Sequence, residues 1–320
     1  MTRITTPFDA TTTAAQVLHD LDLTGSRVIV TGGAAGIGAA TSEALVRAGA
    51  SVVLAVRRPE QGERAAGRLR DAVPGASVEV RPLDLADRGS VRAFTDAWTG
   101  PVDVVIGNAG VMATPERRTP EGWELQFATN HLGHHGLVTG LRDALLAGAD
   151  RSGRPARVVA LSSAGHHTAG VDLDDLMFER RAYDPWVAYG QSKTANALFA
   201  VEATRRWGAD GIVANAVHPG GILTDLSRHL SHEQALAIGI VHEDGSPAEG
   251  FGTPEQGAAT SVLVAASPLV EGVGGRYFED CAEAVAATDD RPLVGVRPWA
   301  LDPDAAERLW DASDALLALR

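Results

Sequence analysis

The feature that most constrains the fold is a series of short apolar segments that alternate with segments of helical periodicity. The strand-like segments are RVIV (27–30), SVVLAV (51–56), SVEVRPLDL (77–85), VDVVIG (102–107), ARVVALSS (156–163) and GIVANAVHP (211–219). Such segments are apolar on both faces, which is typical of a parallel sheet that helices cover on both sides. The sequence therefore predicts a doubly wound α/β fold.

We expect a single domain with an extension at each end. Residues 1–24 precede the first strand and are expected to lie on the surface of a domain that spans 25–280. Within it, 221–252 lacks strand periodicity and is rich in Gly, His and Ser, which predicts a substrate loop. The C-terminal extension, 281–320, ends in DPDAAERLWDASDALLALR, where a capping Asp and a Pro precede apolar residues at helical spacing.

Composition excludes several classes of partner. The net charge of −13 and the pI of about 5.2 argue against nucleic acid and anionic membrane surfaces. A lone cysteine, Cys281, cannot form an internal disulfide, which fits a reducing compartment. The chain shows neither an apolar run of about 18 residues nor a secretory signal. We expect a cytoplasmic enzyme or binding protein with a small-molecule substrate.

A glycine-rich turn, TGGAAGIG (31–38), joins the first strand to the first helix of the domain. Gly32, Gly36 and Gly38 follow the pattern G-x-x-x-G-x-G. Glycines permit a tight turn and let a pyrophosphate approach the N–H groups at a helix N-terminus, where the helix dipole favours anions. The alternative is a turn without a ligand, which the position directly after the first strand disfavours.

The end of the second strand bears on the choice of dinucleotide. An NAD-preferring site usually has an acidic residue here, and this chain has Val56, Arg57 and Arg58. Two guanidinium groups can bind a 2′-phosphate in a forked geometry. The position predicts NADP(H), with NAD(H) as the alternative if both arginines are merely solvated.

Taken in chain order, the motifs resemble the short-chain dehydrogenase/reductase family over about residues 25–280. They are the glycine turn, Asp84-Leu85, the N-A-G of 108–110, TNHLGHHGL (129–137), VVALSS ending at Ser163, YGQSK (189–193) and PGGILT (219–224). The residue before N-A-G departs from the family, which usually has Asn where this chain has Gly107. The longer segment 164–187 and GGRYFEDC (274–281) resemble the retinol-dehydrogenase-like and WW-domain-oxidoreductase-like branch.

The resemblance implies a Rossmann fold and a nicotinamide cofactor. The cofactor-binding positions that it implies are Thr31, Gly32, Gly36, Ile37, Gly38, Arg57, Arg58, Asp84, Leu85, Asn108, Ala109, Gly110, Tyr189, Lys193, Pro219, Gly220, Ile222 and Thr224. It also implies association into a dimer or tetramer, often through the helix that carries YGQSK.

Four residues are implied as the catalytic set, namely Asn130, Ser163, Tyr189 and Lys193. Carbonyl reduction needs a hydride, which a nicotinamide supplies, and a proton donor at the oxygen. Tyr189 and Lys193 lie at i and i+4, on one face of a helix. We expect the ammonium to favour the phenolate and to bond the ribose hydroxyls. By the resemblance, Asn130 would hold a water that connects Lys193 to solvent.

Two members of the implied catalytic set, Ser163 and Lys193, would act on the charges that develop in the reaction. Ser163 would donate a hydrogen bond to the substrate oxygen and stabilise its developing charge. Lys193 is the only lysine among 28 lysines and arginines. A compact ammonium can share its protons between a phenol and a ribose, a role that a planar guanidinium fits poorly.

Other readings of these motifs are weaker. His131 and His135 have the i, i+4 spacing of metal-binding helices, but no H-E-x-x-H is present and we expect no metal. VVALSSAG lacks the G-x-S-x-G of a hydrolase nucleophile elbow. His166 and His167 are expected to line the site or to cap a turn. A protochlorophyllide reductase is disfavoured because the single cysteine lies in the C-terminal region.

The sequence thus predicts an NADP(H)-dependent oxidoreductase that interconverts a carbonyl and an alcohol on a fairly apolar molecule. Its expected pocket is formed by 164–187, 221–252 and the tail. Candidate apolar walls are Val111, Met112, Phe178, Trp186 and Ile222. The alternatives are an NAD-dependent alcohol dehydrogenase of the same family and a non-catalytic NADP-binding regulatory protein.

Overall fold

The computed structural model describes residues 3–224, 226, 232–237, 239–246 and 248–318. The predicted substrate loop, 221–252, therefore falls partly outside the described residues, at 225, 227–231, 238 and 247. The first two residues of the N-terminal extension and the last two of the C-terminal one, 319–320, lie outside them as well.

The described residues form one eight-stranded sheet with the order β3-β2-β1-β4-β5-β6-β7-β8. The strands are β1 (Arg27–Thr31), β2 (Ser51–Val56), β3 (Val78–Pro82), β4 (Val104–Gly107), β5 (Ala156–Leu161), β6 (Ile212–His218), β7 (Tyr277–Glu279) and β8 (Ala282–Glu283). Neighbouring strands are parallel from β3 to β7, and β8 pairs antiparallel with β7. The predicted doubly wound parallel sheet is confirmed.

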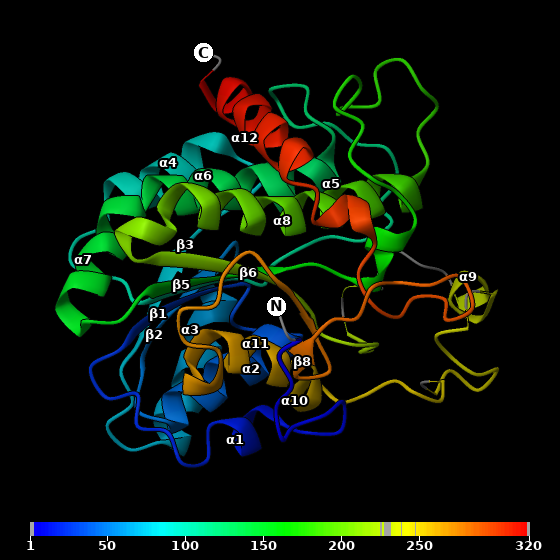
Figure 1. Ribbon diagram of the computed structural model, residues 1–320. Coiled ribbons are helices and arrows are strands. Elements are labelled where there is room, and N and C mark those ends of the chain that lie inside the picture. The colour runs from blue at the N-terminus through cyan, green and yellow to red at the C-terminus, as the bar shows by residue number, and fades with distance from the viewer. Residues whose placement is uncertain (1–2, 225, 227–231, 238, 247, 319–320) are drawn as a thin grey trace.

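Helices cover both faces of the sheet, as Figure 1 shows. On one face lie α4 (Arg88–Asp96), α5 (Leu125–Phe127), α6 (Gly133–Gly140), α7 (Arg142–Ser152), α8 (Pro185–Trp207) and α12 (Pro303–Ala318). On the other lie α1 (Ala14–Val17), α2 (Gly36–Arg47), α3 (Pro59–Ala72), α10 (Pro254–Gly257) and α11 (Ala259–Ala266). The short helix α9 (His232–Ala237) stands apart from both layers.

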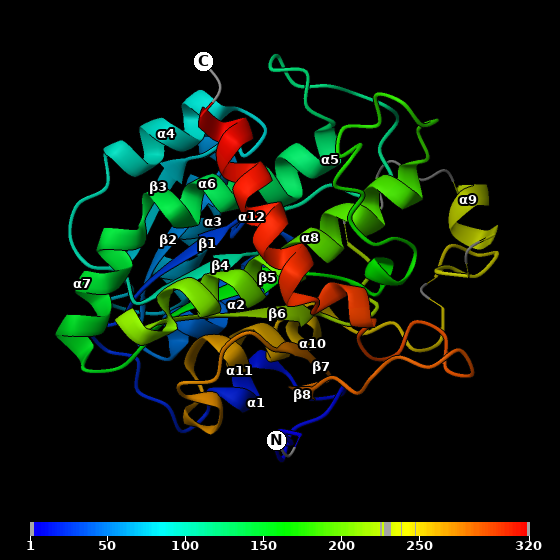
Figure 2. The same cartoon turned by 45° about the horizontal axis from the view of Figure 1, so that its top comes forward.

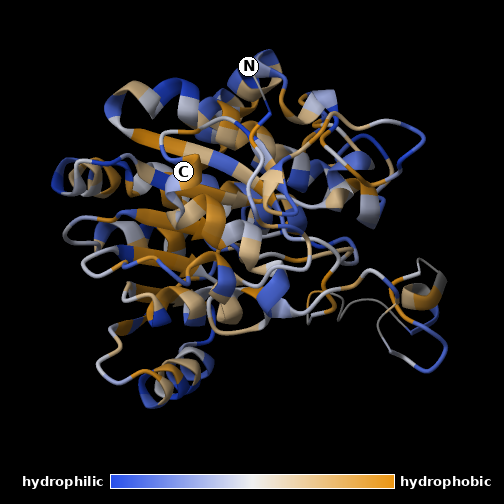
Figure 3. Cartoon of the chain, turned by 60° about the horizontal axis from the view of Figure 1, so that its bottom comes forward, coloured by the Kyte–Doolittle hydropathy of each residue, from blue (hydrophilic) through white to orange (hydrophobic). Residues whose placement is uncertain are grey.

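The core divides into two layers because successive side chains of a strand point to opposite faces of the sheet. In β1, Val28 and Val30 pack with α2, α3 and α11, whereas Ile29 packs with α4, α6, α7 and α8. The strands are mostly apolar on both faces, and Figure 3 shows them as largely hydrophobic between helices of mixed hydropathy. This two-sided burial produces the continuous apolar runs seen in the sequence.

The last two strands were not predicted. Strands of three and two residues are too short to show a periodicity, and their turn is unusual. Asp280 and Cys281 join them with positive φ angles of 48° and 59°, although neither is glycine. The sheet therefore continues past residue 280 into the segment assigned to the C-terminal extension.

The N-terminal segment is part of the sheet edge and of the core, in addition to covering the surface. The N–H of Glu283 in β8 donates to the carbonyl of Ile4, and the Thr6 hydroxyl donates to the Cys281 carbonyl. Helix α1 begins with a capping box at Thr13 and buries Ala14 and Val17 in the layer beneath α11.

No helix among the described residues has the length and hydropathy needed to cross a membrane.

Helix α12 lies across α8 and α6, as the turned view in Figure 2 shows. Trp310 is its anchor: the indole stacks on Phe199 with ring centroids 5.4 Å apart and meets Trp207 edge-on at 5.0 Å. Ion pairs from Arg205 to Glu307 and from Arg206 to Asp311 surround this contact. The structure has the predicted C-terminal helix, and it packs on α8, the helix through which the resemblance implies association.

We predict that Trp310→Ala destabilises the protein strongly. Trp310 is 4% exposed, so truncation leaves a large cavity, and such substitutions cost about 3–5 kcal/mol. Equilibrium urea denaturation measures the loss. The matched control is Trp299→Ala, whose indole is 38% exposed and whose removal should cost far less. Equal losses in the two variants would contradict the assignment of α12 to the core.

Candidate active site

The glycine turn has the backbone geometry that its sequence predicts. Gly32 and Gly36 adopt positive φ angles of 64° and 52°, and a Cβ at Gly38 would collide with the Gly32 carbonyl and the Asn108 amide. The N-cap of α2, Ala35, provides no side-chain hydrogen bond to the described helix. The first N–H groups of α2 can therefore face an anion, which fits the pyrophosphate of a dinucleotide.

Thr31 joins the glycine turn to the N-A-G segment after β4. Its carbonyl accepts a hydrogen bond from Asn108 Nδ2 at 2.8 Å, and its Oγ1 accepts one from the Ala109 N–H at 2.9 Å. The same hydroxyl lies 2.8 Å from Nε2 of His134. The structure thus brings Thr31, Asn108 and Ala109 together, and adds His134, which the sequence suggested only as a candidate metal ligand and not as part of the cofactor site.

The ends of β2 and β3 carry the polar residues expected near adenosine. Arg57 and Arg58 are exposed directly after β2, and neither forms an ion pair with any residue that the structure describes. Asp84 accepts a hydrogen bond from the Ala86 N–H at 3.0 Å, which fixes its carboxylate in a turn after β3. Leu85 is buried beside these residues and packs with the layer beneath α6.

The segment after β6 returns to the glycine turn. A Cβ at Gly36 would lie 3.3 Å from the Thr224 methyl group, so Thr224 lies directly over the turn. Ile222 forms a bridge with Gly252 and, like Ile37, approaches Gly257 of α10. Pro219 and Gly220 lead from β6 into this segment. The predicted positions of 219–224 therefore gather at the same edge as α2.

Asn130 lies in a π-helical turn, 128–132, between α5 and α6. Its Oδ1 accepts from the Val111 N–H at 2.8 Å, and its Nδ2 donates to the Val111 carbonyl and to Ser192 Oγ, both at 2.9 Å. The backbone carbonyl of Asn130 accepts from Nδ1 of His134 at 2.9 Å. Because both amide protons are committed, a water bound to Asn130 would have to donate, either to the second lone pair of the backbone carbonyl or to that of Oδ1.

Tyr189 and Ser163 form the centre of the site. The Tyr189 ring packs against Gly165, where a Cβ would come within 2.6 Å of it, and Trp186 meets it edge-on at 6.3 Å. Burial raises the pKa of Tyr189 to about 12, and its hydrogen bond with Ser163 opposes this shift. Ser163 Oγ accepts from the Gly165 N–H at 3.1 Å, which leaves the hydroxyl proton available to an acceptor.

Lys193 faces the end of β5 as well as the phenol. Its Nζ donates to the Leu161 carbonyl at 2.9 Å and lies 5.7 Å from the centroid of the Tyr189 ring. Burial lowers the pKa of Lys193 to about 8. Burial dominates and raises the pKa of the phenol, so the lowering that was expected from the ammonium does not prevail.

The middle residues of YGQSK have structural partners that the sequence did not reveal. Gln191 Oε1 accepts from the Asp172 N–H at 3.2 Å and from Arg181 at 2.6 Å, and its Nε2 donates to the Leu176 carbonyl at 2.9 Å. A Cβ at Gly190 would collide with Thr168 and with the Gly165 carbonyl. The helix that carries Tyr189 and Lys193 is thereby fixed to segment 164–187 on another face.

The histidines with metal-like spacing bind α12. His131 Nε2 lies 2.8 Å from Ser313 Oγ, whose own proton goes to the Leu309 carbonyl, so His131 is the donor. His135 Nε2 lies 2.7 Å from a carboxylate oxygen of Asp314. Among the described residues no group of three or more His, Cys, Asp or Glu side chains could hold a metal ion.

The candidate apolar walls of the pocket fall into two groups in the structure, residues buried in the core and residues that are partly exposed. Phe178 is buried and packs with Tyr183 and beneath the Arg181 guanidinium, which is core packing rather than a pocket wall. Met112, Trp186 and Ile222 are partly exposed; of these, Trp186 meets Tyr189 edge-on and Ile222 lies in the segment over the glycine turn. Segment 164–187 also contributes Leu176 and Met177 to a hydrophobic core cluster with α5, α8 and α12.

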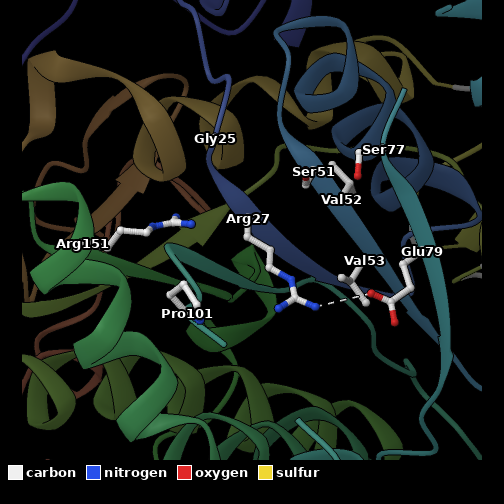
Figure 4. Close-up of a pocket in the computed structure, with 9 residues that line it drawn as sticks. All are labelled: Gly25, Arg27, Ser51, Val52, Val53, Ser77, Glu79, Pro101 and Arg151. Atoms are coloured by element: carbon white, nitrogen blue, oxygen red, sulfur yellow. Dashed lines mark hydrogen bonds and ion pairs between the residues drawn. The ribbon is translucent and has the colours of Figure 1, made fainter. Parts of the chain in front are cut away.

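The cavity in Figure 4 is not the catalytic site. It has a volume of about 330 Å³ and lies at the edge of the sheet where β1, β2 and β3 begin, whereas Tyr189 lies at the edge where the strands end. Its Arg27 pairs with Glu79 at 3.5 Å and stacks on Trp98. In α/β sheets ligands bind at the carboxyl ends of the strands, so we assign the site there.

Known proteins resemble this chain over most of its length. The model of the short chain dehydrogenase family matches residues 26–235. A protein named "Probable oxidoreductase" from Streptomyces antibioticus is 52% identical over 304 residues, which cover 93% of this chain and 100% of that protein. Retinol dehydrogenase 14 of Homo sapiens is 37% identical over 311 residues, which cover 92% of this chain and 87% of that protein.

Two solved structures show the same architecture. An uncharacterised protein from Mycobacterium paratuberculosis has a TM-score of 0.71 at 34% identity, covering 94% of this chain and 96% of that one. A protein from Beutenbergia cavernae, described as an NAD(P)-dependent gluconate 5-dehydrogenase with bound NADP, has a TM-score of 0.62 at 25% identity. The latter similarity covers 81% of this chain and 96% of that one.

We predict a loss of stability between pH 6.5 and pH 5. Burial lowers the pKa of His134 and His166 to about 4 and that of His218 to about 3, so the unfolded chain binds more protons in this window. For one histidine, a pKa lowered from 6.5 to about 4 reduces the free energy of unfolding by about 3 kcal/mol once the pH lies below both values. Glu279, whose pKa burial raises to about 7, acts in the opposite direction and offsets part of this effect.

Urea denaturation at half-unit steps of pH measures this dependence. His134→Gln cannot titrate and should show a shallower pH dependence than the wild type. A free energy of unfolding that is constant from pH 6.5 to pH 5 in the wild type would contradict the prediction.

Proposed function

Since the chain belongs to the short-chain dehydrogenase/reductase family, in its retinol-dehydrogenase-like branch, we propose that it is an NADP(H)-dependent enzyme for fairly apolar carbonyls and alcohols. The family acts on CH–OH and C=O groups with a nicotinamide cofactor. The observation that carries the proposal is the meeting of Tyr189, Ser163 and Lys193 at the sheet edge that also holds the glycine turn.

The bound nicotinamide would supply or accept the hydride. Tyr189 keeps its proton at neutral pH because burial holds its pKa at about 12, so it is the proton donor to the substrate oxygen in reduction. The Ser163 hydroxyl would donate to the same oxygen, since its Oγ already accepts from the Gly165 N–H. Lys193, one helical turn from Tyr189, would stabilise the phenolate that remains.

The preference for NADP(H) rests on charge at the end of β2. Arg57 and Arg58 are exposed beside the glycine turn and have no carboxylate neighbour in the strand end. A 2′-phosphate placed there would gain charge-assisted hydrogen bonds, whereas a ribose hydroxyl would not need them. The NADP bound to the similar protein from Beutenbergia cavernae supports this choice. The alternative is an enzyme that uses NAD(H).

The apolar character of the substrate rests on the rim of the site and on one relative. Trp186, which meets Tyr189 edge-on, and Met112, in the segment that follows the N-A-G of 108–110, are both partly exposed. The relative named retinol dehydrogenase 14 supports an apolar alcohol or aldehyde as the substrate class. A screen of aldehydes, ketones and alcohols, read by NADPH absorbance, would identify the substrate.

We predict that Tyr189→Phe abolishes turnover but leaves cofactor binding intact. Losing the proton donor should lower kcat by about 10²–10⁴-fold, the usual contribution of general acid–base catalysis. Steady-state kinetics measure kcat, and fluorescence titration measures the Kd for NADPH. Tyr183→Phe is the matched control, since its hydroxyl bonds Thr114 and Gln126 away from the reacting centre. Turnover retained by Tyr189→Phe would overturn the mechanism.

We predict that Arg57→Ala weakens NADPH binding by about 10-fold, the order of one lost charge-assisted hydrogen bond. The Kd for NADH should stay unchanged because NADH has no 2′-phosphate. Fluorescence titration with both cofactors measures the two constants. Arg64→Ala, an exposed arginine further along α3, is the control. Equal weakening for both cofactors, or none, would contradict the proposed preference.

A further inference from the structure

The backbone carbonyl of Ser163 is held by two buried side chains outside the predicted catalytic set. His166 Nδ1 lies 2.7 Å from this oxygen, and the Tyr277 hydroxyl donates to it at 3.3 Å. Both His166 and Tyr277 are 1% exposed. Ser163 itself caps the short 3₁₀ turn 164–167 that carries His166. The position of the serine is therefore fixed from the interior of the protein.

The hydrogen bonds of His166 determine its tautomer. A carbonyl oxygen can only accept, so Nδ1 is the protonated nitrogen facing Ser163. Nε2 is then the acceptor, and it receives the N–H of Arg297 at 3.1 Å. Burial lowers the pKa of His166 to about 4, so this neutral tautomer persists across the neutral range. Nδ1 therefore donates to the Ser163 carbonyl, with the Tyr277 hydroxyl also 3.2 Å away, and Nε2 accepts.

The second partner of His166 belongs to the C-terminal extension, and further contacts hold that segment in place. Trp299 Nε1 donates to the His166 carbonyl at 3.1 Å. His167 Nε2 lies 3.0 Å from the Gly295 carbonyl, while Glu279 accepts from the Gly295 N–H at 2.9 Å. Segment 295–299 is thereby attached to the turn that follows Ser163.

We propose that His166 is a positioning residue for Ser163, and that segment 295–299 completes the active site by holding His166 in place. The inference rests on the proposed function, because it gives His166 the role of orienting the Ser163 hydroxyl, which would bind the substrate oxygen. His166 does not touch the substrate in this assignment. It acts through the Ser163 carbonyl, and a shift of about 1 Å in such a group is enough to impair catalysis.

Two amide substitutions separate the two hydrogen bonds of His166. His166→Asn places an amide nitrogen near the position of Nδ1 and can keep the bond to the Ser163 carbonyl. His166→Gln extends its amide toward the position of Nε2 and can keep only the bond from Arg297. We expect His166→Asn to keep kcat within about threefold of the wild type and His166→Gln to lower it about 10–100-fold, as for lost supporting hydrogen bonds.

The readouts distinguish this inference from the proposed function. If the wild type oxidises or reduces no carbonyl or alcohol with NADP(H), the proposed function fails. If the wild type is active and the Gln variant keeps its kcat, or the Asn and Gln variants lose it equally, the positioning role is overturned. The Kd for NADPH should stay within about twofold in both variants, and a loss of binding that accounts for the lower kcat would also overturn it.

A spectroscopic test does not depend on activity. Nitrogen-15 NMR of the wild-type protein should show the His166 imidazole neutral and protonated at Nδ1 at pH 7. An Nε2-protonated ring would overturn the inference. His166→Asn and His166→Gln serve to assign the signal, since it must be absent from both.

A third variant tests the C-terminal segment. Trp299→Phe removes the indole donor to the His166 carbonyl and should lower kcat about two- to fivefold without changing the Kd for NADPH. Trp98→Phe is the matched control because its indole donates to the Gly100 carbonyl at 3.0 Å, at the opposite edge of the sheet. Equal kcat values in the two variants would overturn the role of segment 295–299.

Discussion

The arrangement of the site depends on one chain of hydrogen bonds at the carboxyl edge of the sheet. The Asn130 carbonyl accepts from His134, whose other nitrogen meets Thr31, and Thr31 in turn accepts from the Ala109 N–H and from Asn108. Nδ1 of His134 must be the donor because it faces a carbonyl, so Thr31 donates to Nε2. Parallel strands bring their carboxyl ends to one edge, which is why residues a hundred positions apart can form this chain.

Burial, more than pairing of charges, sets the protonation of the catalytic groups. Desolvation raises the pKa of Tyr189 to about 12 and lowers that of Lys193 to about 8, so at pH 7 the phenol keeps its proton and the lysine stays mostly charged. A protonated phenol suits reduction, where Tyr189 gives up its proton, whereas oxidation requires the phenolate to be stabilised. The lysine is held by the Leu161 carbonyl, which Asn196 also contacts, so its distance from the phenol is determined by the end of β5.

The sequence predicts the parts of this structure that local patterns determine. Two-sided apolar segments predicted β1 to β6 and their parallel sheet, and the glycines of the turn follow from positive φ angles that other residues rarely adopt. The strands β7 and β8 are too short to show a pattern. The partners of Gln191 and His166 could not be predicted, because they come from tertiary contacts that no spacing of residues reveals. The rise in the pKa of Tyr189 was missed for the same reason, since the motif shows the lysine but not the burial.

The paired histidines of two motifs connect the site to the C-terminal extension. His131 and His135 in NHLGHH bind Ser313 and Asp314 of α12, while the pair in SSAGHH binds segment 295–299. In both motifs the histidines lie one to five residues after a predicted catalytic residue, Asn130 or Ser163. A minimal sheet with its helices would leave these imidazoles without partners in the interior, where an unsatisfied polar group is costly. The extension and the histidines therefore depend on each other, which makes the extension part of the active-site scaffold.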